Sequence, residues 1–228
     1  MMGLILSACG SHVYHRVERG DSLYSIGWQY DQDYRQVATW NNLKPPYVLA
    51  PGQWLRVAPP LQGAHSAAVS VPTPDKSKVP AAPVITGVVP APPPTATKPS
   101  PGIASHAWRW PTRGELIRTF SAYEPGKKGV DIRGRLGQPI WSAAAGRVVY
   151  GGNGLAAYGN LLIIKHDDNY LTAYAHNHKL RVQEGDSVTA GQHIADMGKS
   201  GTEQVMLHFE IRYQGKPMDP LRYLPAIP

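Results

Sequence analysis

Hydrophobic and polar residues follow regular patterns at both ends of the chain. From 13 to 17 they alternate, which predicts a short β-strand. Leu23, Ile26 and Tyr30 then recur at the spacing of one helical face. Residues 53–57 read as a second strand. The N-terminal region is therefore expected to combine strands with helices.

Capping residues divide this region further. Asp21 follows a turn and is placed to cap the first helix. Asp33 precedes a second predicted helix over 34–40, which is expected to end at Asn41-Asn42. The order strand, helix, helix, strand predicts a small α+β module within residues 12–58.

The C-terminal part has a different pattern, in which short apolar runs are separated by turns rich in Gly, Asn and Asp. Each run has the length and composition of a β-strand, and no helical periodicity of useful length accompanies them. The predicted strands are 147–150, 161–165, 170–174 and 207–212. Residues 106–228 are expected to form an antiparallel all-β domain.

The stretch between the two patterned regions is rich in proline. Residues 58–105 hold 12 of the chain's 22 prolines, four charged residues and no aromatic residue. Such a segment cannot bury enough apolar surface to offset its ordering entropy, which predicts a disordered, Pro-rich linker over 59–105. The 228-residue chain is therefore expected to be multidomain rather than one large enzyme core.

Charge and cysteine content narrow the classes of function. Twenty-three Lys and Arg against 16 Asp and Glu give a net charge of +7, which favours a polyanionic partner. No nucleic-acid-binding motif accompanies this charge, so a nucleic-acid partner is not expected. A single cysteine excludes an internal disulfide framework and a Cys-rich metal site. The sequence also lacks an apolar run of the length that a membrane-spanning helix needs.

The lone cysteine, Cys9, closes the stretch Leu6-Ser7-Ala8-Cys9 and is followed by Gly10. This stretch resembles a bacterial lipobox, so residues 1–9 are interpreted as the remnant of a lipoprotein signal, with the true start upstream. The resemblance implies that Cys9 is acylated and anchors the chain in a membrane. Because no Asp follows Cys9, it also implies the periplasmic face of the outer membrane. The alternative is an ordinary free cysteine near a chain terminus.

Three runs of the N-terminal module, 17–26, 37–43 and 49–57, together resemble the LysM domain family. The resemblance implies binding to glycans that contain N-acetylglucosamine, here peptidoglycan, in a shallow groove between two loops. The glycan-binding residues it implies are Gly20, Asp21, Ser22, Leu23, Asn41 and Asn42. In the alternative interpretation, Asp21 and Asn41 only cap helices.

From about Trp108 to Leu224 the chain is similar to the LytM, or M23 peptidase, fold. The runs that carry the similarity occur in the family's order and are 128–132, 137–148, 158–160, 172–176, 182–186, 197–201 and 207–212. In this family zinc is held by a His-x-x-x-Asp motif and by the second His of a His-x-His pair, while other histidines move protons.

Mapped on this family's motifs, Asp131 and His208 occupy two of the zinc-ligand positions and His176 keeps its place. The remaining two key positions differ, because Lys127 stands where a ligand His is expected and Met206 where a catalytic His is expected. An ammonium ligates zinc only when deprotonated, and a thioether has no proton to transfer. The resemblance thus implies a degenerate site with no catalytic residue, no metal and no cofactor.

Lipobox, LysM, tether and LytM together resemble the NlpD group of cell-division lipoproteins. This resemblance implies activation of N-acetylmuramoyl-L-alanine amidases during septal murein splitting and cell separation, by a chain that is itself not an enzyme. The vacated groove is then expected to bind the amidase, and its expected residues are Lys127, Lys128, Asp131, His176, Met206, His208 and Arg212. Two alternatives remain open: an active zinc endopeptidase that cuts peptidoglycan cross-bridges, and a passive wall-binding tether.

Overall fold

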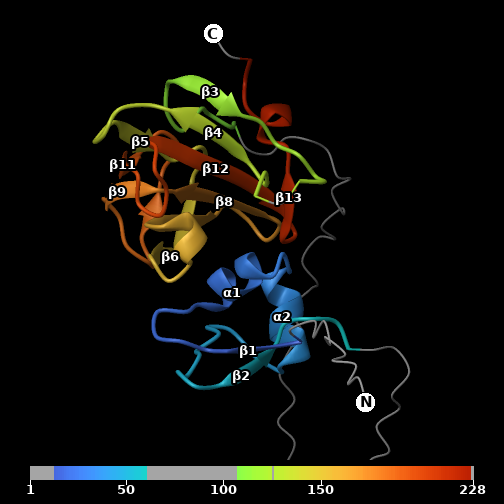
Figure 1. Cartoon of the computed structure of the whole chain (residues 1–228). Helices are drawn as coiled ribbons and strands as arrows, with labels where there is room; N and C mark the ends of the chain where they lie inside the picture. Colours follow the sequence, from blue (N-terminus) through green and yellow to red (C-terminus); the bar gives the residue numbers. More distant parts are fainter. Residues whose placement is uncertain (1–12, 61–106, 125, 227–228) are drawn as a thin grey trace, which may run out of the picture. The chain divides into compact units, whose positions relative to one another are not determined.

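The computed structural model describes residues 13–60, 107–124 and 126–226 (Figure 1). Cys9 and nearly all of the predicted linker lie outside the described residues. Within the described ranges, none of the helices has the length and apolar character required to cross a membrane.

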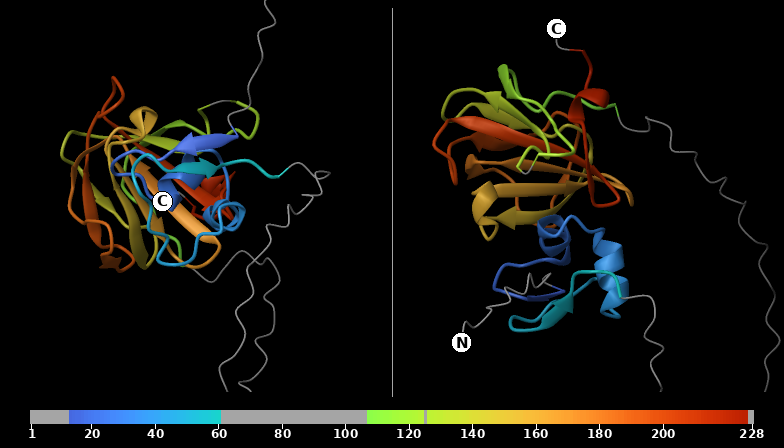
Figure 2. Two further views of the ribbon diagram at one scale, coloured as in Figure 1. Left: turned by 90° about the horizontal axis from the view of Figure 1, so that it is seen from below. Right: turned by 45° about the vertical axis from the view of Figure 1, so that its right-hand side comes forward.

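The N-terminal module consists of β1 (Tyr14–Arg16), α1 (Leu23–Gln29), α2 (Tyr34–Trp40) and β2 (Trp54–Arg56), which confirms the predicted order. β1 and β2 pair antiparallel, and both helices lie on the same side of this small sheet (Figure 2). The core between sheet and helices is apolar and includes Val17, Leu23, Ile26, Val37 and Leu55. The apolar periodicity seen in the sequence is thus the buried face of α1.

The cap of α1 differs from the prediction. Ser22, not Asp21, is the N-cap: its Oγ accepts the Ser25 N–H at 3.1 Å, and Ser25 Oγ accepts the Ser22 N–H at 3.0 Å. This reciprocal capping box satisfies two backbone donors at once. Asp21 instead accepts the N–H of Glu18 at 2.9 Å and contacts His15 Nε2 at 2.8 Å. Asp33 caps α2 as predicted, accepting the Arg35 N–H at 2.8 Å.

The C-terminal domain is all-β and antiparallel, as the sequence predicts. Its larger sheet has the order β10-β6-β7-β8-β12-β4-β3, with β13 paired to β12, and a smaller sheet has the order β5-β11-β9. The strands of the larger sheet are β3 (Glu115–Arg118), β4 (Val130–Arg133), β6 (Gly146–Gly152), β7 (Leu161–Lys165), β8 (Tyr170–Ala175), β10 (Ser187–Val188), β12 (Met206–Tyr213) and β13 (Lys216–Met218). The smaller sheet contains β5 (Pro139–Trp141), β9 (Asn177–Leu180) and β11 (His193–Met197), and two short 3-10 helices, η1 (Ala156–Tyr158) and η2 (Pro220–Arg222), complete the described elements.

Strand β12 lies between β4 and β8 and belongs to both the core and the site. Because side chains alternate along a strand, Leu207, Phe209 and Ile211 share one face and are completely buried in the main apolar cluster. The other face carries His208 and Glu210. The fold therefore places a row of polar side chains on one face of a strand in the interior of the sheet.

Candidate functional site

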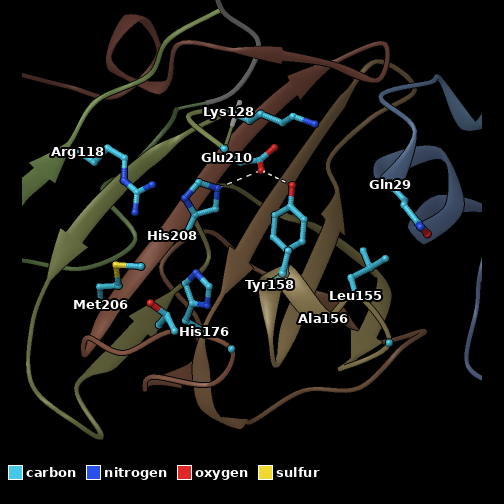
Figure 3. A pocket seen from close by; sticks show the side chains of 15 residues that line it. Gln29, Arg118, Lys128, Leu155, Ala156, Tyr158, His176, Met206, His208 and Glu210 are labelled. Atoms are coloured by element: carbon cyan, nitrogen blue, oxygen red, sulfur yellow. Dashed lines mark hydrogen bonds and ion pairs between the residues drawn. The ribbon is translucent and has the colours of Figure 1, made fainter. Parts of the chain in front are cut away.

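The polar face of β12 forms the floor of a pocket in the C-terminal domain (Figure 3). Its walls come from β3, the loop before β4, the segment around η1, the turn after β8 and the loop before β12. The side chains of this domain that line it include Arg118, Lys128, Leu155, Ala156, Tyr158, His176, Thr202, Met206, His208 and Glu210. The pocket thus joins cationic, apolar and acidic groups from five distant parts of the chain.

His208 is held between two carboxylates. The β4–β12 register places it opposite Asp131, and its Nδ1 lies 2.6 Å from Asp131 Oδ1, while its Nε2 lies 3.1 Å from Glu210 Oε1. Burial lowers the pKa of His208, but the hydrogen bonds to Asp131 and Glu210 outweigh it and raise the pKa to about 9. His208 is therefore an imidazolium at neutral pH and donates from both ring nitrogens.

Glu210 connects His208 to further groups behind it. Its Oε1 also accepts the Tyr158 hydroxyl at 2.8 Å (Figure 3). Its Oε2 accepts Arg212 Nε at 2.9 Å. Burial raises the pKa of Glu210, but the charges of Arg212 and His208 outweigh burial and lower it to about 2. Burial and the Glu210 charge raise the pKa of Tyr158. Glu210 is thus ionised and Tyr158 keeps its proton.

Arg118 forms an ion pair with Asp131 at the other end of this row of charged groups. A shift in the β3–β4 register brings it opposite Asp131, and its Nη2 lies 2.6 Å from Asp131 Oδ2. The contact is an ion pair without the alignment of a hydrogen bond, since Asp131 Oδ2 has no hydrogen-bond partner in the described part of the chain. The Arg118 side chain is 42% exposed and Asp131 is 1% exposed, so the guanidinium lies between the carboxylate and solvent. Sequence reasoning did not single out Arg118, Glu210 or Tyr158.

The residues predicted for a partner groove fall into two groups. Lys128, His176, Met206 and His208 line the pocket, and Asp131 lies beside them in an adjoining hollow of about 310 Å³. Lys127 is not among the pocket-lining residues, and its Nζ pairs with Glu124 at 2.6 Å. Arg212 is also absent from the lining and lies behind Glu210.

His176 sits at the end of β8 with a left-handed backbone, φ 64°. Its Nδ1 lies 2.8 Å from the Ser200 carbonyl, and its ring centroid is 6.2 Å from that of His208. Burial lowers the pKa of His176, with the charge of His208 adding to the effect. The two histidines of the pocket are therefore expected to differ in charge at neutral pH, His176 neutral and His208 protonated.

The predicted glycan-binding residues lie in the two loops of the N-terminal module and on α1. Gly20 has φ +88° in the turn before α1, and Ser22 caps that helix. Leu23 is 1% exposed and packs in the core. The Asn41 amide binds the carbonyl of Val37 and both backbone groups of Arg56 at 2.7 to 2.8 Å, which ties α2 to β2. Asn42, with φ 55°, and Gly20 are the exposed members of this set, so both are accessible to a ligand.

The titration of His208 predicts a pH dependence of stability. Its folded pKa of about 9 lies above the ordinary value of 6.5, so its stabilising contribution is fully present below pH 6.5 and is lost as pH rises through about 9. The pKa values of His176 and Glu210 are lowered, so these groups affect stability only below pH 6.5. The pKa of Tyr158 is raised from 10, so this group affects stability only above the range from pH 6.5 to 9. We expect the unfolding free energy of residues 106–228, measured by urea denaturation, to fall from pH 6.5 to 9.

The matched variants for this measurement are His208→Gln and His178→Gln, the second of which removes an exposed histidine of β9. The slope should disappear in the first and remain in the second. An unchanged slope in His208→Gln would contradict the assignment.

Comparison with known proteins assigns the N-terminal module and the C-terminal domain to known domain families. Residues 15–58 match the LysM domain and residues 125–220 match peptidase family M23. The chain is 43% identical to "Lipoprotein NlpD/LppB homolog" of Pseudomonas aeruginosa over 92% of this chain and 76% of that protein. It is 41% identical to "Murein hydrolase activator NlpD" of Escherichia coli over 92% and 67%, and 40% identical to "Uncharacterized lipoprotein YgeR" of Escherichia coli over 98% and 90% of the two chains.

Proposed function

Because the chain belongs to the NlpD family of lipoproteins, with a LysM domain and an M23 peptidase domain, we propose that it activates murein hydrolases without being one. In this proposal the hydrolases are N-acetylmuramoyl-L-alanine amidases that split septal murein. Residues 12–58 bind peptidoglycan, and residues 106–228 bind the amidase. Acylated Cys9 anchors the chain at the periplasmic face of the outer membrane.

The observation that carries the proposal is the closed chain of charges Arg118–Asp131–His208–Glu210–Arg212. Each carboxylate in it lies between two cationic groups, so the site supplies its own positive charge. Buried carboxylates paired in this way need no metal to be stabilised. This arrangement supports the proposal that the M23-like fold is used here for binding and not for hydrolysis.

The side chains of the pocket do not fit the zinc ion of M23 peptidases. The hydrogen bonds with Asp131 and Glu210 raise the pKa of His208 and favour the imidazolium form, which has no lone pair for a metal. The outer oxygen of Asp131 faces the guanidinium of Arg118 at 2.6 Å, where a second cation would be repelled. In the described ranges, no three His, Cys, Asp or Glu side chains are grouped so that they could hold a metal. In this proposal the domain carries out no catalytic step.

The pocket suits a protein segment that carries carboxylates. Arg118 and Lys128 line it, and Leu155 and Met206 add apolar surface. Arginine binds carboxylates through paired hydrogen bonds, and a thioether adapts to irregular apolar partners. Activation then follows from population shift: the pocket must bind the open form of the amidase more tightly than the self-blocked form.

Amidase stimulation by residues 106–228 tests this function. We expect the domain to increase dye release from labelled peptidoglycan by a cognate amidase and to release no dye alone. Release by the domain alone would restore the endopeptidase alternative. Absence of stimulation for every amidase of the organism would leave the passive tether as the better explanation.

Zinc content gives an independent measurement. We expect the chain purified without chelators to carry far less than one zinc per molecule by elemental analysis, because His208 and Asp131 are engaged by Glu210 and Arg118. The double variant Lys127→His with Met206→His should gain some zinc without gaining amidase stimulation. Stoichiometric zinc in the unmodified chain would contradict the proposal that the site is inactive.

A further inference from the structure

The outer face of the β1–β2 sheet carries two aromatic side chains and two arginines. Strand alternation puts Tyr14 and Arg16 of β1 on this face with Trp54 and Arg56 of β2, while Leu55 points into the core. Neither strand contains an acidic residue. This face is directed away from α1 and α2, which cover the opposite side of the sheet (Figure 2).

The register makes two aromatic–arginine pairs. Tyr14 lies opposite Arg56, whose guanidinium is 5.3 Å from the ring centroid and donates from Nη2 to the Tyr14 hydroxyl at 3.1 Å. Arg16 lies opposite Trp54. The two aromatic residues are 50% and 65% exposed, the largest exposed rings among the described residues of this module. Core packing does not account for large rings at this level of exposure.

This combination of groups has a specific ligand chemistry. Trp and Tyr rings have an apolar body and a polar edge and settle at the headgroup level of a bilayer. Guanidinium groups match phosphate oxygens through paired hydrogen bonds. We propose that the face of Tyr14, Arg16, Trp54 and Arg56, here called the outer sheet face, binds anionic phospholipid headgroups.

The position of the outer sheet face in the chain favours lipid over glycan. Tyr14 is five residues after Cys9, a span of at most about 18 Å even when fully extended. An acyl group on Cys9 would therefore keep this face at the bilayer surface; the proposal rests to this extent on the anchoring proposed above, but not on amidase activation. The predicted glycan residues lie mainly in the loops before α1 and after α2, so the two ligands need not compete.

Vesicle sedimentation of the full chain carrying Cys9→Ser tests the outer sheet face without help from a lipid anchor. Vesicles of phosphatidylethanolamine and phosphatidylglycerol should pellet this protein at physiological salt, and phosphatidylcholine vesicles should pellet less. Replacing Arg16 and Arg56 by Ser should lower the partition coefficient by about 25-fold, at about fivefold for each basic residue near an anionic surface. Replacing Tyr14 and Trp54 by Ser should lower it by about tenfold, because two interfacial rings are lost.

Matched controls separate this face from general attraction of a basic chain. Arg113→Ser with Arg135→Ser removes the same charge from exposed sites of the other domain, and Tyr123→Ser removes a ring that is 96% exposed. The partition coefficients of both control variants should stay within about twofold of that of the parent, because salt screens the charges that lie far from the bilayer. All variants should still pellet with insoluble peptidoglycan and stimulate the amidase.

Three results would overturn the proposal: no vesicle binding by the parent, equal losses in the controls, or loss of peptidoglycan binding in place of vesicle binding. The last would make the outer sheet face a glycan site. The vesicle assay does not depend on the amidase assay. Failure of amidase activation can therefore be distinguished from failure of phospholipid binding by the outer sheet face.

Discussion

Lys128→Glu is expected to reduce amidase stimulation by residues 106–228 by about tenfold or more, because it places a like charge against the carboxylates that the pocket is proposed to bind. Lys128 and Arg118 both line the pocket. The initial rate of dye release at a fixed amidase concentration measures the effect. Urea denaturation of the variant checks that the domain remains folded, since Lys128 is partly exposed.

The neighbouring residue provides the matched control. Lys127→Glu makes the same charge change one position away, but Lys127 pairs with Glu124 and is not among the pocket-lining residues. Its loss of stimulation should be several-fold smaller. Equal losses would show that the net charge of the loop, not the pocket, attracts the amidase, and undiminished stimulation by Lys128→Glu would overturn the pocket model.

Asp131→Ala is expected to lower the unfolding free energy of residues 106–228 by about 3 kcal/mol or more, as expected when one partner of a buried charge network is removed. Asp131 is completely buried and contacts both Arg118 and His208 at 2.6 Å. Without it, the guanidinium loses its counter-charge and the buried imidazolium keeps only Glu210. The midpoint of urea denaturation measures the change.

Asp168→Ala is the control, because Asp168 pairs with Lys165 in an ion pair where the carboxylate is 80% exposed. Exposed pairs of this kind contribute at most about 1 kcal/mol. If the two variants were equally stable, Asp131 would have to be solvated in the folded domain, and the closed chain of charges would not exist.

Local patterns predicted the elements of the N-terminal module well. The helix over 34–40 and its cap Asp33 are both observed. The first backbone N–H groups of a helix have no partner within the helix, and an Asp directly before an apolar-periodic run provides an acceptor for them. Asp21 failed as a cap because Ser22 and Ser25 form a reciprocal pair, and Asp21 is drawn to His15. Ser22 directly follows Asp21, and the position of a polar residue before a helix does not by itself show which neighbour caps it.

The charge network was harder to predict, because strand pairing between distant segments creates it. Arg118 reaches Asp131 only through the irregular register of β3 with β4, which no local pattern specifies. A signal for Glu210 was present, since His208, Glu210 and Arg212 alternate with apolar residues and so share one face of a strand. Three ionisable side chains on one face of an otherwise apolar strand indicate a buried ionic row.

The central position of β12 also determines where a bound partner can be detected by hydrogen–deuterium exchange. β12 is paired on both sides, with β4 and β8, so its amides are expected to exchange only through global unfolding. Protection at such amides cannot rise noticeably when a partner covers the pocket. The informative amides lie in the segments 154–158 and 200–205 that border the pocket, where slower exchange in the presence of amidase would outline the footprint.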